Sequence, residues 1–336
     1  MSAPISYMIA SLMLLALAAG GGRDPASSAH GMLVVANQGD HTALLIDPRT
    51  RKELMKVTVG INGHEVAVSP DSRLAYVPIY GNSGVGKPGT DGHAIDIIDL
   101  RERKLVASID LGKPIRPHRA EFGPDGMLYV SAELDKALDV IDPSTRKVLA
   151  EIPTGASESH MFIISPDGSR AYTANVGPGS VSVLDLKNRS LITVIPIAKT
   201  VQRISITPDG KRVFTHDQDN PRIAVIDTTT NKIASWIPLP GTVYSSSPTP
   251  DGRKLLAASP SGKLFVIDLA SFKLEQSFDI PAAAGELLIT PDGNFAFISC
   301  PQTGVIEVFD VRGNKLLEPI KLTRGVDGLA WAPAIP

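Results

Sequence analysis

Short apolar segments separated by turn sequences recur along most of the chain. Six of the turns contain proline followed by aspartate, and glycine or serine comes next. Their prolines are Pro70, Pro124, Pro166, Pro208, Pro250 and Pro291, at spacings of 54, 42, 42, 42 and 41 residues. Proline fixes φ at the second turn position, aspartate bonds to nearby backbone, and glycine accepts a positive φ. Each turn is therefore predicted to join two strands of a repeated unit.

A second series of residues marks the end of another strand in each repeat. These residues are Asp47, Asp99, Asp142, Asp185, Asp227, Asp268 and Asp310. Lysine follows five residues later in every repeat but one, where Ser190 stands instead. We interpret each interval as a hairpin whose amides the carboxylate accepts. Repeats of about 40–45 residues with four short strands each predict a β-propeller, and seven aspartates predict seven blades.

Three segments carry a resemblance to a known family. They are Tyr172-Thr173-Ala174-Asn175, its echo Val34-Val35-Ala36-Asn37, and the Asp-Thr-Thr-Thr-Asn-Lys run at 227–232. Together with the Pro-Asp-Gly turns, this pattern resembles the YVTN-repeat (YncE-like) β-propeller family. The resemblance implies an all-β, seven-bladed propeller of four-stranded antiparallel blades over residues 31–336. It implies no single activity, because propellers host unrelated functions.

The chain is predicted to start and end within one blade. Residues 32–37, 43–48 and 53–59 supply three strands of that blade, and the inner strand is missing. The segment from Gly328 to Pro333 is in register with the inner strands of the other repeats. We therefore expect the C-terminal strand to pair with the N-terminal segment and close the ring, with Trp331 in the core between blades.

The N-terminal segment predicts export. Residues 8–19 are apolar but short for a membrane span, and small residues follow them. We expect a signal peptide over 1–19, a flexible linker over 20–30 and the propeller over 31–336, in a periplasmic or secreted protein. The first seven residues contain no lysine or arginine, so an uncleaved anchor is the alternative. After signal removal, no stable membrane span is expected.

Composition limits the classes of partner. The net charge is −2 and aromatic residues make up 5% of the chain, which disfavours nucleic acid as a partner. Cys300 is the only cysteine, so no internal disulfide can form. Residues 81–88, Gly-Asn-Ser-Gly-Val-Gly-Lys-Pro, are similar to a P-loop, but Pro88 replaces the residue that would coordinate Mg²⁺. We expect a surface loop there.

Aligning the inner strands places three histidines at one register. His64, His118 and His160 stand six residues before the turn proline of three consecutive repeats. The other repeats carry Gln202, Tyr244, Gly285 and Asp327 there, and the following residues include Glu65, Arg119, Arg203 and Glu286. The resemblance implies that these positions begin the innermost strands and surround one mouth of the central channel. The same face is expected to carry His41, His93, His216 and Asp217.

The histidine register allows three interpretations. Three neutral imidazoles could bind a transition metal such as Zn, Cu or Fe, with Glu65, Glu158 or Asp327 orienting the rings. A small anionic or polar ligand could be held by Arg119, Arg203, Tyr244 and Asp327. Alternatively, the rings only pack on their neighbours and bind channel water.

No residue set defines a reaction. The leading hypothesis is therefore a binding or interaction protein that takes an unknown small molecule or protein at the channel-mouth face. The first alternative is a channel-mouth enzyme, a metal-assisted oxidoreductase or a lactonase, that uses the histidines as ligands or bases. The second alternative is single-stranded DNA binding, an activity associated with a YncE-like relative.

Overall fold

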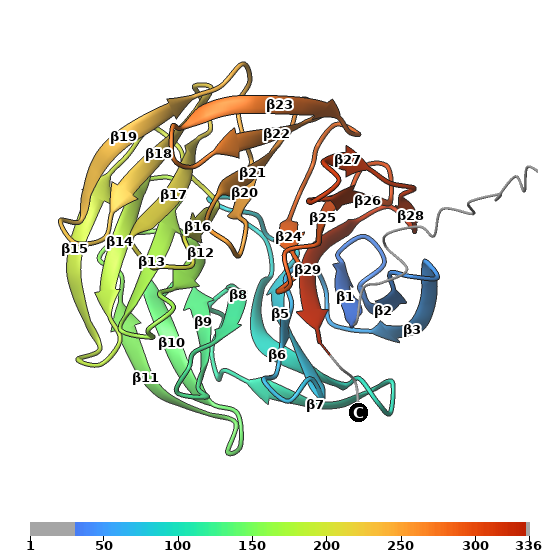
Figure 1. The fold of residues 1–336 in the computed structure, drawn as a ribbon. Helices are drawn as coiled ribbons and strands as arrows, with labels where there is room; N and C mark the ends of the chain where they lie inside the picture. The colour runs from blue at the N-terminus through green and yellow to red at the C-terminus, as the bar shows by residue number, and fades with distance from the viewer. Residues whose placement is uncertain (1–30, 334–336) are drawn as a thin grey trace, which may run out of the picture.

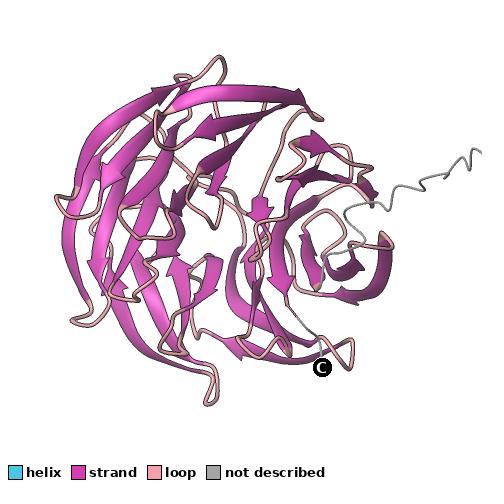
Figure 2. Ribbon diagram, viewed as in Figure 1, coloured by secondary structure: helices cyan, strands magenta, loops and turns pink. Residues whose placement is uncertain are grey.

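The computed structural model describes residues 31–333, and these residues form strands and loops without a helix (Figure 2). No helix long and apolar enough to cross a membrane occurs among them. The predicted signal peptide and linker lie outside the described residues. Seven antiparallel sheets surround a common centre (Figure 1), as the two series of turns predict. We number these sheets as blades 1–7 from the N-terminus.

The blades share one order, in which the first strand lies innermost. Blade 1 is β29 (Val326–Ala332), β1 (Met32–Asn37), β2 (Thr42–Asp47) and β3 (Lys52–Thr58); blade 2 is β4 (Ala67–Val68), β5 (Leu74–Gly81), β6 (Asp91–Asp99) and β7 (Lys104–Asp110). Blade 3 is β8 (Pro117–Phe122), β9 (Leu128–Ala132), β10 (Ala137–Asp142) and β11 (Lys147–Pro153); blade 4 is β12 (Ser159–Ile164), β13 (Arg170–Asn175), β14 (Ser180–Asp185) and β15 (Ser190–Pro196).

The remaining three blades follow the same plan. Blade 5 is β16 (Ile204–Ile206), β17 (Arg212–Asp217), β18 (Arg222–Asp227) and β19 (Lys232–Pro238); blade 6 is β20 (Ser245–Pro248), β21 (Lys254–Ser259), β22 (Lys263–Asp268) and β23 (Lys273–Asp279). Blade 7 is β24 (Leu287–Ile289), β25 (Phe295–Cys300), β26 (Val305–Asp310), β27 (Lys315–Leu316) and β28 (Ile320–Lys321). Its outer edge is split, because β27 and β28 both pair with β26.

The predicted ring closure is confirmed. The C-terminal strand β29 pairs antiparallel with β1, with Leu33 opposite Trp331 and Val35 opposite Leu329. Trp331 also stacks on Phe297 of blade 7 at a ring-centroid distance of 5.9 Å. The first and last described strands therefore belong to one sheet, and the innermost position of blade 1 is filled by the end of the chain.

The hydrophobic core lies between neighbouring blades rather than at one centre. Leu33 and Val35 of blade 1 pack with Phe297 and Val308 of blade 7, and comparable buried clusters fill the spaces between the other neighbours. Strands in such sheets are covered on both faces, which explains why β1, β2 and β14 read as nearly continuous buried runs. Their unbroken apolar pattern follows from that burial.

The seven strand-ending aspartates have the structural role predicted for them. Each accepts hydrogen bonds from the backbone of the following turn, as Asp99 does from the amides of Arg101 and Glu102. The corresponding bonds of the other repeats involve Asp47, Asp142, Asp185, Asp227, Asp268 and Asp310. These bonds lower the pKa of Asp99, because backbone amides favour the ionised carboxylate.

Candidate functional site

The three register-matched histidines reach the channel from similar backbone positions. His118 and His160 lie near the beginnings of β8 and β12, whereas His64 precedes the short strand β4. The residue two positions before each histidine has a left-handed backbone, with φ of 57° at Asn62, 52° at Arg116 and 55° at Glu158. This conformation is unfavourable for residues with a side chain. Because this conformation recurs at one register, the backbone approaches each of the three histidines in the same way.

The structure brings the three imidazoles together. The Nε2 atoms of His64 and His118 are 2.5 Å apart. The rings of His118 and His160 lie over one another with centroids 3.5 Å apart. His118 and His160 are each only 3% exposed, and His64 is partly exposed. The cluster is therefore buried on two blades and reaches solvent through the third.

The contacts of the ring nitrogens fit one set of neutral tautomers. Nδ1 of His64 lies 3.2 Å from the carbonyl oxygen of Asn62, so it donates there and leaves Nε2 as an acceptor. Nε2 of His118 must then donate to His64, and Nδ1 of His118 carries a lone pair. That Nδ1 atom is buried and has no hydrogen-bond partner among residues 31–333.

Both buried histidines are held neutral. Burial lowers the pKa of His118 well below its ordinary value, and the nearby rings of His160 and His64 add to the effect. Burial also lowers the pKa of His160, although the Glu133 carboxylate opposes it. Neutral imidazoles are the forms that accept a ligand's proton or bind a metal ion.

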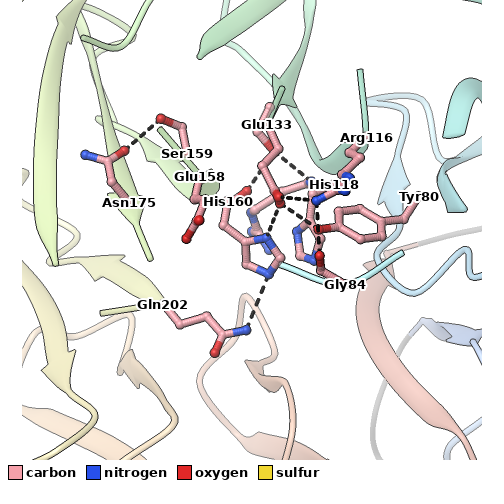
Figure 3. Close-up of polar contacts among 12 residues, drawn as sticks. Tyr80, Gly84, Arg116, His118, Glu133, Glu158, Ser159, His160, Asn175 and Gln202 are labelled. Atoms are coloured by element: carbon pink, nitrogen blue, oxygen red, sulfur yellow. Dashed lines mark hydrogen bonds and ion pairs between the residues drawn. The ribbon is translucent and has the colours of Figure 1, made fainter. Parts of the chain in front are cut away.

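Glu133 orients His160, and the sequence analysis did not identify this role. Its Oε2 atom accepts from the Tyr80 hydroxyl at 2.7 Å and from His160 Nδ1 at 3.1 Å, while Arg116 Nη1 lies 3.3 Å from Oε1 (Figure 3). Burial would raise the pKa of Glu133, but the bonds from His160, Tyr80 and Arg116 lower it below its ordinary value. The Nε2 atom of His160 then faces the Gln202 amide at 3.4 Å.

Two of the three acidic residues proposed from sequence to orient the histidines, Glu65 and Glu158, have other partners. Glu158 accepts from the backbone N–H of Gly177 at 2.7 Å, and Glu65 pairs with arginine. Glu133 could have been noticed by register, since it stands nine residues after Pro124, where other repeats carry Asn175, Asp217 and Ser259. Its longer side chain reaches the neighbouring blade, which spacing within one repeat does not reveal.

Five charged residues predicted at the channel mouth form a network, namely Glu65, Arg119, Arg203, Glu286 and Asp327. Arg203 is buried, with Nη2 at 3.2 Å from Glu65 and 3.6 Å from Asp327, and it also pairs with Glu286. Its guanidinium lies 5.0 Å from the centre of the Tyr244 ring.

Arg119 joins the same network, with Nη1 at 3.7 Å from Glu65 and 3.6 Å from Glu286. Both guanidinium groups therefore have carboxylate partners within the chain. Burial raises the pKa of Asp327, although Arg203 opposes this effect.

The other histidines expected on this face are not part of the cluster. His93 is exposed and pairs with Asp110 at 3.1 Å. His216 is fully buried, its Nε2 lies 2.8 Å from the hydroxyl of Ser246, and burial lowers its pKa to about 3. His41 accepts from the backbone of Asn62.

The blade-2 loop, residues 81–91, covers the approach to Glu133. Arg116 holds this loop by donating to the carbonyl oxygens of Gly84 at 3.1 Å and Lys87 at 2.8 Å, and by pairing with Asp91. A cavity of about 330 Å³ lies between the loop and blades 3 and 4, with Arg116 and Glu133 in its lining. The P-loop-like segment thus forms no helix and lies on the rim of a cavity that reaches Glu133.

The present positions of the rings do not match a metal centre. Within residues 31–333, no group of three or more His, Cys, Asp and Glu side chains has the geometry to hold a metal ion. Two nitrogen ligands at about 2.0–2.1 Å from a tetrahedral zinc ion lie roughly 3.3 Å apart. The 2.5 Å separation between His64 Nε2 and His118 Nε2 is shorter than this, so the two nitrogen atoms contact each other directly.

Comparisons with known proteins identify relatives of the fold. The chain matches no protein-family model. A curated relative, dihydro-heme d1 dehydrogenase of Pseudomonas aeruginosa, is 35% identical over 78 residues, which are 23% of this chain and 16% of the relative. The match thus spans less than a fifth of that protein's length.

Similar solved structures share the architecture. Hydrazine synthase of Kuenenia stuttgartiensis aligns with a TM-score of 0.69 and 20% identity, over 89% of this chain and 93% of that chain. A functionally unknown protein of Desulfotomaculum acetoxidans aligns with a TM-score of 0.75 and 15% identity, over 90% of this chain and 99% of that chain. Dihydro-heme d1 dehydrogenase NirN in complex with DHE aligns with a TM-score of 0.65 and 16% identity, over 91% of this chain and 75% of that chain. At these identities the likeness concerns the propeller fold alone.

Proposed function

We propose that this chain is an exported β-propeller of the YVTN-repeat (YncE-like) kind that binds a small-molecule ligand at its histidine cluster. The observation that carries the proposal is the buried Nδ1 atom of His118, which has a free lone pair and no partner among the described residues. A buried polar atom without a partner costs free energy, so such atoms are rare unless a ligand or water satisfies them. His64, whose Nε2 atom contacts His118, is the partly exposed member of the cluster.

The surroundings of the cluster support ligand binding. Glu133 fixes His160 from one side, and the blade-2 loop is tied above it by Arg116. The charged network of Arg119 and Arg203 borders the other side and has no excess of positive charge, because Glu65, Glu286 and Asp327 balance it. The part of the ligand that faces this network should therefore be neutral or cationic. Alternatively, the ligand should donate a hydrogen bond to a histidine ring nitrogen.

Protein purified without a histidine tag would test the proposal. It should be analysed for metals and for retained organic molecules, and then titrated with haem, because the curated relative is named for a heme substrate. Saturable binding that His118→Ala weakens at least tenfold, with His93→Ala unchanged, is expected. Absence of any retained or added ligand, or binding insensitive to His118→Ala, would reject the proposal. Stoichiometric bound metal lost in the His118 variant would favour the metal interpretation.

An enzyme at the same site is the second candidate. The observation that favours it is the bond from His160 to Glu133, since a carboxylate that orients an imidazole is a common arrangement in acid–base catalysis. The name of the curated relative, a dehydrogenase, adds support over the matched 78 residues. Lactone hydrolysis and dye-linked oxidation should be assayed across pH. Glu133→Gln should lower the rate and alter the pH profile if His160 takes part, and an unchanged profile would exclude it.

Export needs a separate test. Residues 8–19 and the small residues after them support a cleaved signal peptide. N-terminal sequencing of the protein from its native compartment should give a start near residue 19 or 20. A soluble product that starts at Met1 would refute export.

A further inference from the structure

The outer strands of the propeller share a β-bulge at one register. In β7, Leu105 pairs with Ile98 and Ala107 with Ile97, which leaves Val106 as the extra residue. The same shift leaves Leu149 unpaired in β11 and Ile192 unpaired in β15. A bulge of this kind turns the extra residue away from the regular ladder. Three neighbouring blades thus present an aliphatic side chain at the same point.

These aliphatic side chains are exposed. Val106 is 42%, Leu149 48% and Ile192 42% exposed, and the adjacent Leu105 and Val148 are 44% and 38% exposed. The bulge does not require them, because blades 5 and 6 have the same register shift with Ala234 and Glu275 as the extra residues. Five exposed aliphatic residues grouped on three adjacent blades are candidates for a contact surface, because isolated exposed residues alone would be ordinary.

Basic residues directly precede the aliphatic ones. We define the basic–apolar rim as residues 101–106, 146–149 and 187–192 of blades 2, 3 and 4. Its cations are Arg101, Arg103, Lys104, Arg146, Lys147, Lys187 and Arg189, and its only acidic residue is Glu102. Among residues 31–333, Arg146, Lys147 and Arg189 have no ion-pair partner in the structure. The hairpin aspartates Asp99, Asp142 and Asp185 lie beside the rim and accept turn amides, so the seven cations outnumber these three carboxylates and Glu102.

Blades 5–7 lack this combination of basic residues and exposed large aliphatic residues at the bulge. The left-handed hairpin position that Arg103, Arg146 and Arg189 occupy in blades 2–4 holds Asn231, Phe272 and Asn314 in blades 5–7. The rim also lies on the face opposite the histidine cluster, because inner strands begin at one face and the strand-ending aspartates lie at the other. Contact through the rim would leave the channel mouth accessible.

We propose that the basic–apolar rim docks the propeller on an anionic phospholipid surface. Aliphatic side chains at one level can enter the region between headgroups and acyl chains, while arginine and lysine contact lipid phosphates. A nucleic acid would use the charges but needs aromatic platforms for its bases, and the exposed apolar residues of the rim are all aliphatic. The pairing of charge with aliphatic exposure therefore favours lipid.

Co-sedimentation of the full chain with vesicles would test the proposal. Vesicles of equal phosphatidylglycerol and phosphatidylcholine should bind the protein, and binding should weaken as salt rises. The charge variant Arg103→Gln/Arg146→Gln/Arg189→Gln should lower binding about tenfold or more. The apolar variant Val106→Ser/Leu149→Ser/Ile192→Ser should also lower it severalfold. The control Lys232→Gln/Lys273→Gln/Lys315→Gln makes the same charge change on blades 5–7 and should bind as the unchanged protein does.

Three results would overturn the proposal. Equal losses in the rim and control variants would indicate unspecific charge attraction. Equal binding of all variants to pure phosphatidylcholine vesicles would assign the contact to another part of the chain. Charge-dependent binding of a single-stranded oligonucleotide that the apolar variant retains, without vesicle binding, would assign the rim to nucleic acid.

Discussion

Asp139, on β10, is a buried carboxyl group outside the candidate site. It is 3% exposed, and its Oδ1 atom has no hydrogen-bond partner among the described residues. Burial raises the pKa of Asp139 to about 7, and the charges of Glu151 and Asp135 add to this while Lys113 opposes it. A carboxyl group whose pKa is higher in the folded than in the unfolded state makes the protein less stable as pH rises between the two values.

We predict that Asp139→Asn stabilises the protein above neutral pH. In the unchanged protein, the free energy of unfolding should fall between about pH 4 and pH 7 as this buried group ionises. The variant lacks that ionisation, so it should be more stable at pH 8 by on the order of 3 kcal/mol. Urea unfolding at pH 5 and pH 8 measures the difference.

Asp142→Asn provides a control with the opposite sign. Hydrogen bonds from Ser144 lower the pKa of Asp142, so its contribution is present above its unfolded pKa and is lost in acid. The variant should therefore be less stable than the unchanged protein at pH 8. If Asp139→Asn also destabilises the protein at pH 8, the predicted rise in the pKa of Asp139 is wrong.

At the scale of the elements, five of the six Pro-Asp turns contain a hydroxyl group bonded to the turn aspartate. The Oγ1 atom of Thr249 donates to Asp251 Oδ1 at 2.5 Å and accepts from the backbone N–H of Lys254 at 3.0 Å. Ser69, Ser165, Thr207 and Thr290 make equivalent bonds. Blade 3 has Gly123 at this position and lacks the hydroxyl group.

Thr249→Val should lower the free energy of unfolding by about 1 kcal/mol, because it removes both bonds and keeps the shape. Denaturant unfolding monitored by fluorescence or circular dichroism measures the loss. The same loss should follow Thr290→Val in blade 7. A neutral result in both blades would show that the hydroxyl bonds are not needed for turn stability.

Gly123→Thr should not stabilise the protein, although repeat comparison alone suggests that it would. A Cβ atom at Gly123 would lie 2.6 Å from Asp125 Oδ1 and 2.7 Å from the Tyr129 ring. The Tyr129 hydroxyl donates to Asp125 Oδ2 at 2.8 Å, so this aspartate already has a hydroxyl donor. We expect a loss of stability, and a gain in the same unfolding measurement would contradict the observed contacts.

At the scale of the whole molecule, Arg203 connects blades that are distant in sequence. From blade 5 it pairs with Glu65 of blade 2, Glu286 of blade 7 and Asp327 of blade 1. Arg203→Met should cost about 3 kcal/mol at pH 7.5, since it leaves buried carboxylates without their cation. The loss should be smaller near pH 5, because burial raises the pKa of Asp327 and favours its protonated form there. Arg253→Met, at an exposed ion pair, is the control and should have little effect.

Removal of the closing strand should destabilise every blade. Without residues 326–336, β1 loses its partner, and the open sheet edges favour aggregation. A lower melting temperature and loss of the monomer in size-exclusion chromatography are expected. A truncated protein that remains monomeric with the same melting temperature would show that closure does not stabilise the ring.

The sequence by itself determined the repeat and therefore the fold. Turn chemistry is local, so the series of turn prolines and strand-ending aspartates was sufficient to place the hairpins, the blade number and the closing segment. Register also predicted that His64, His118 and His160 lie together, because corresponding residues of similar repeats occupy corresponding positions around the ring. That argument needs no knowledge of contacts between blades.

Only the tertiary structure decided the chemistry of those residues. Glu133, Tyr80 and Arg116 reach His160 across blades, and distances between blades have no trace in the spacing within a repeat. The tautomers, the pairing of Arg203 with three carboxylates and the outward turn of Val106 likewise depend on which side chains meet in space. Local sequence specifies turns and strands, whereas burial and long-range contact set protonation, pairing and exposure.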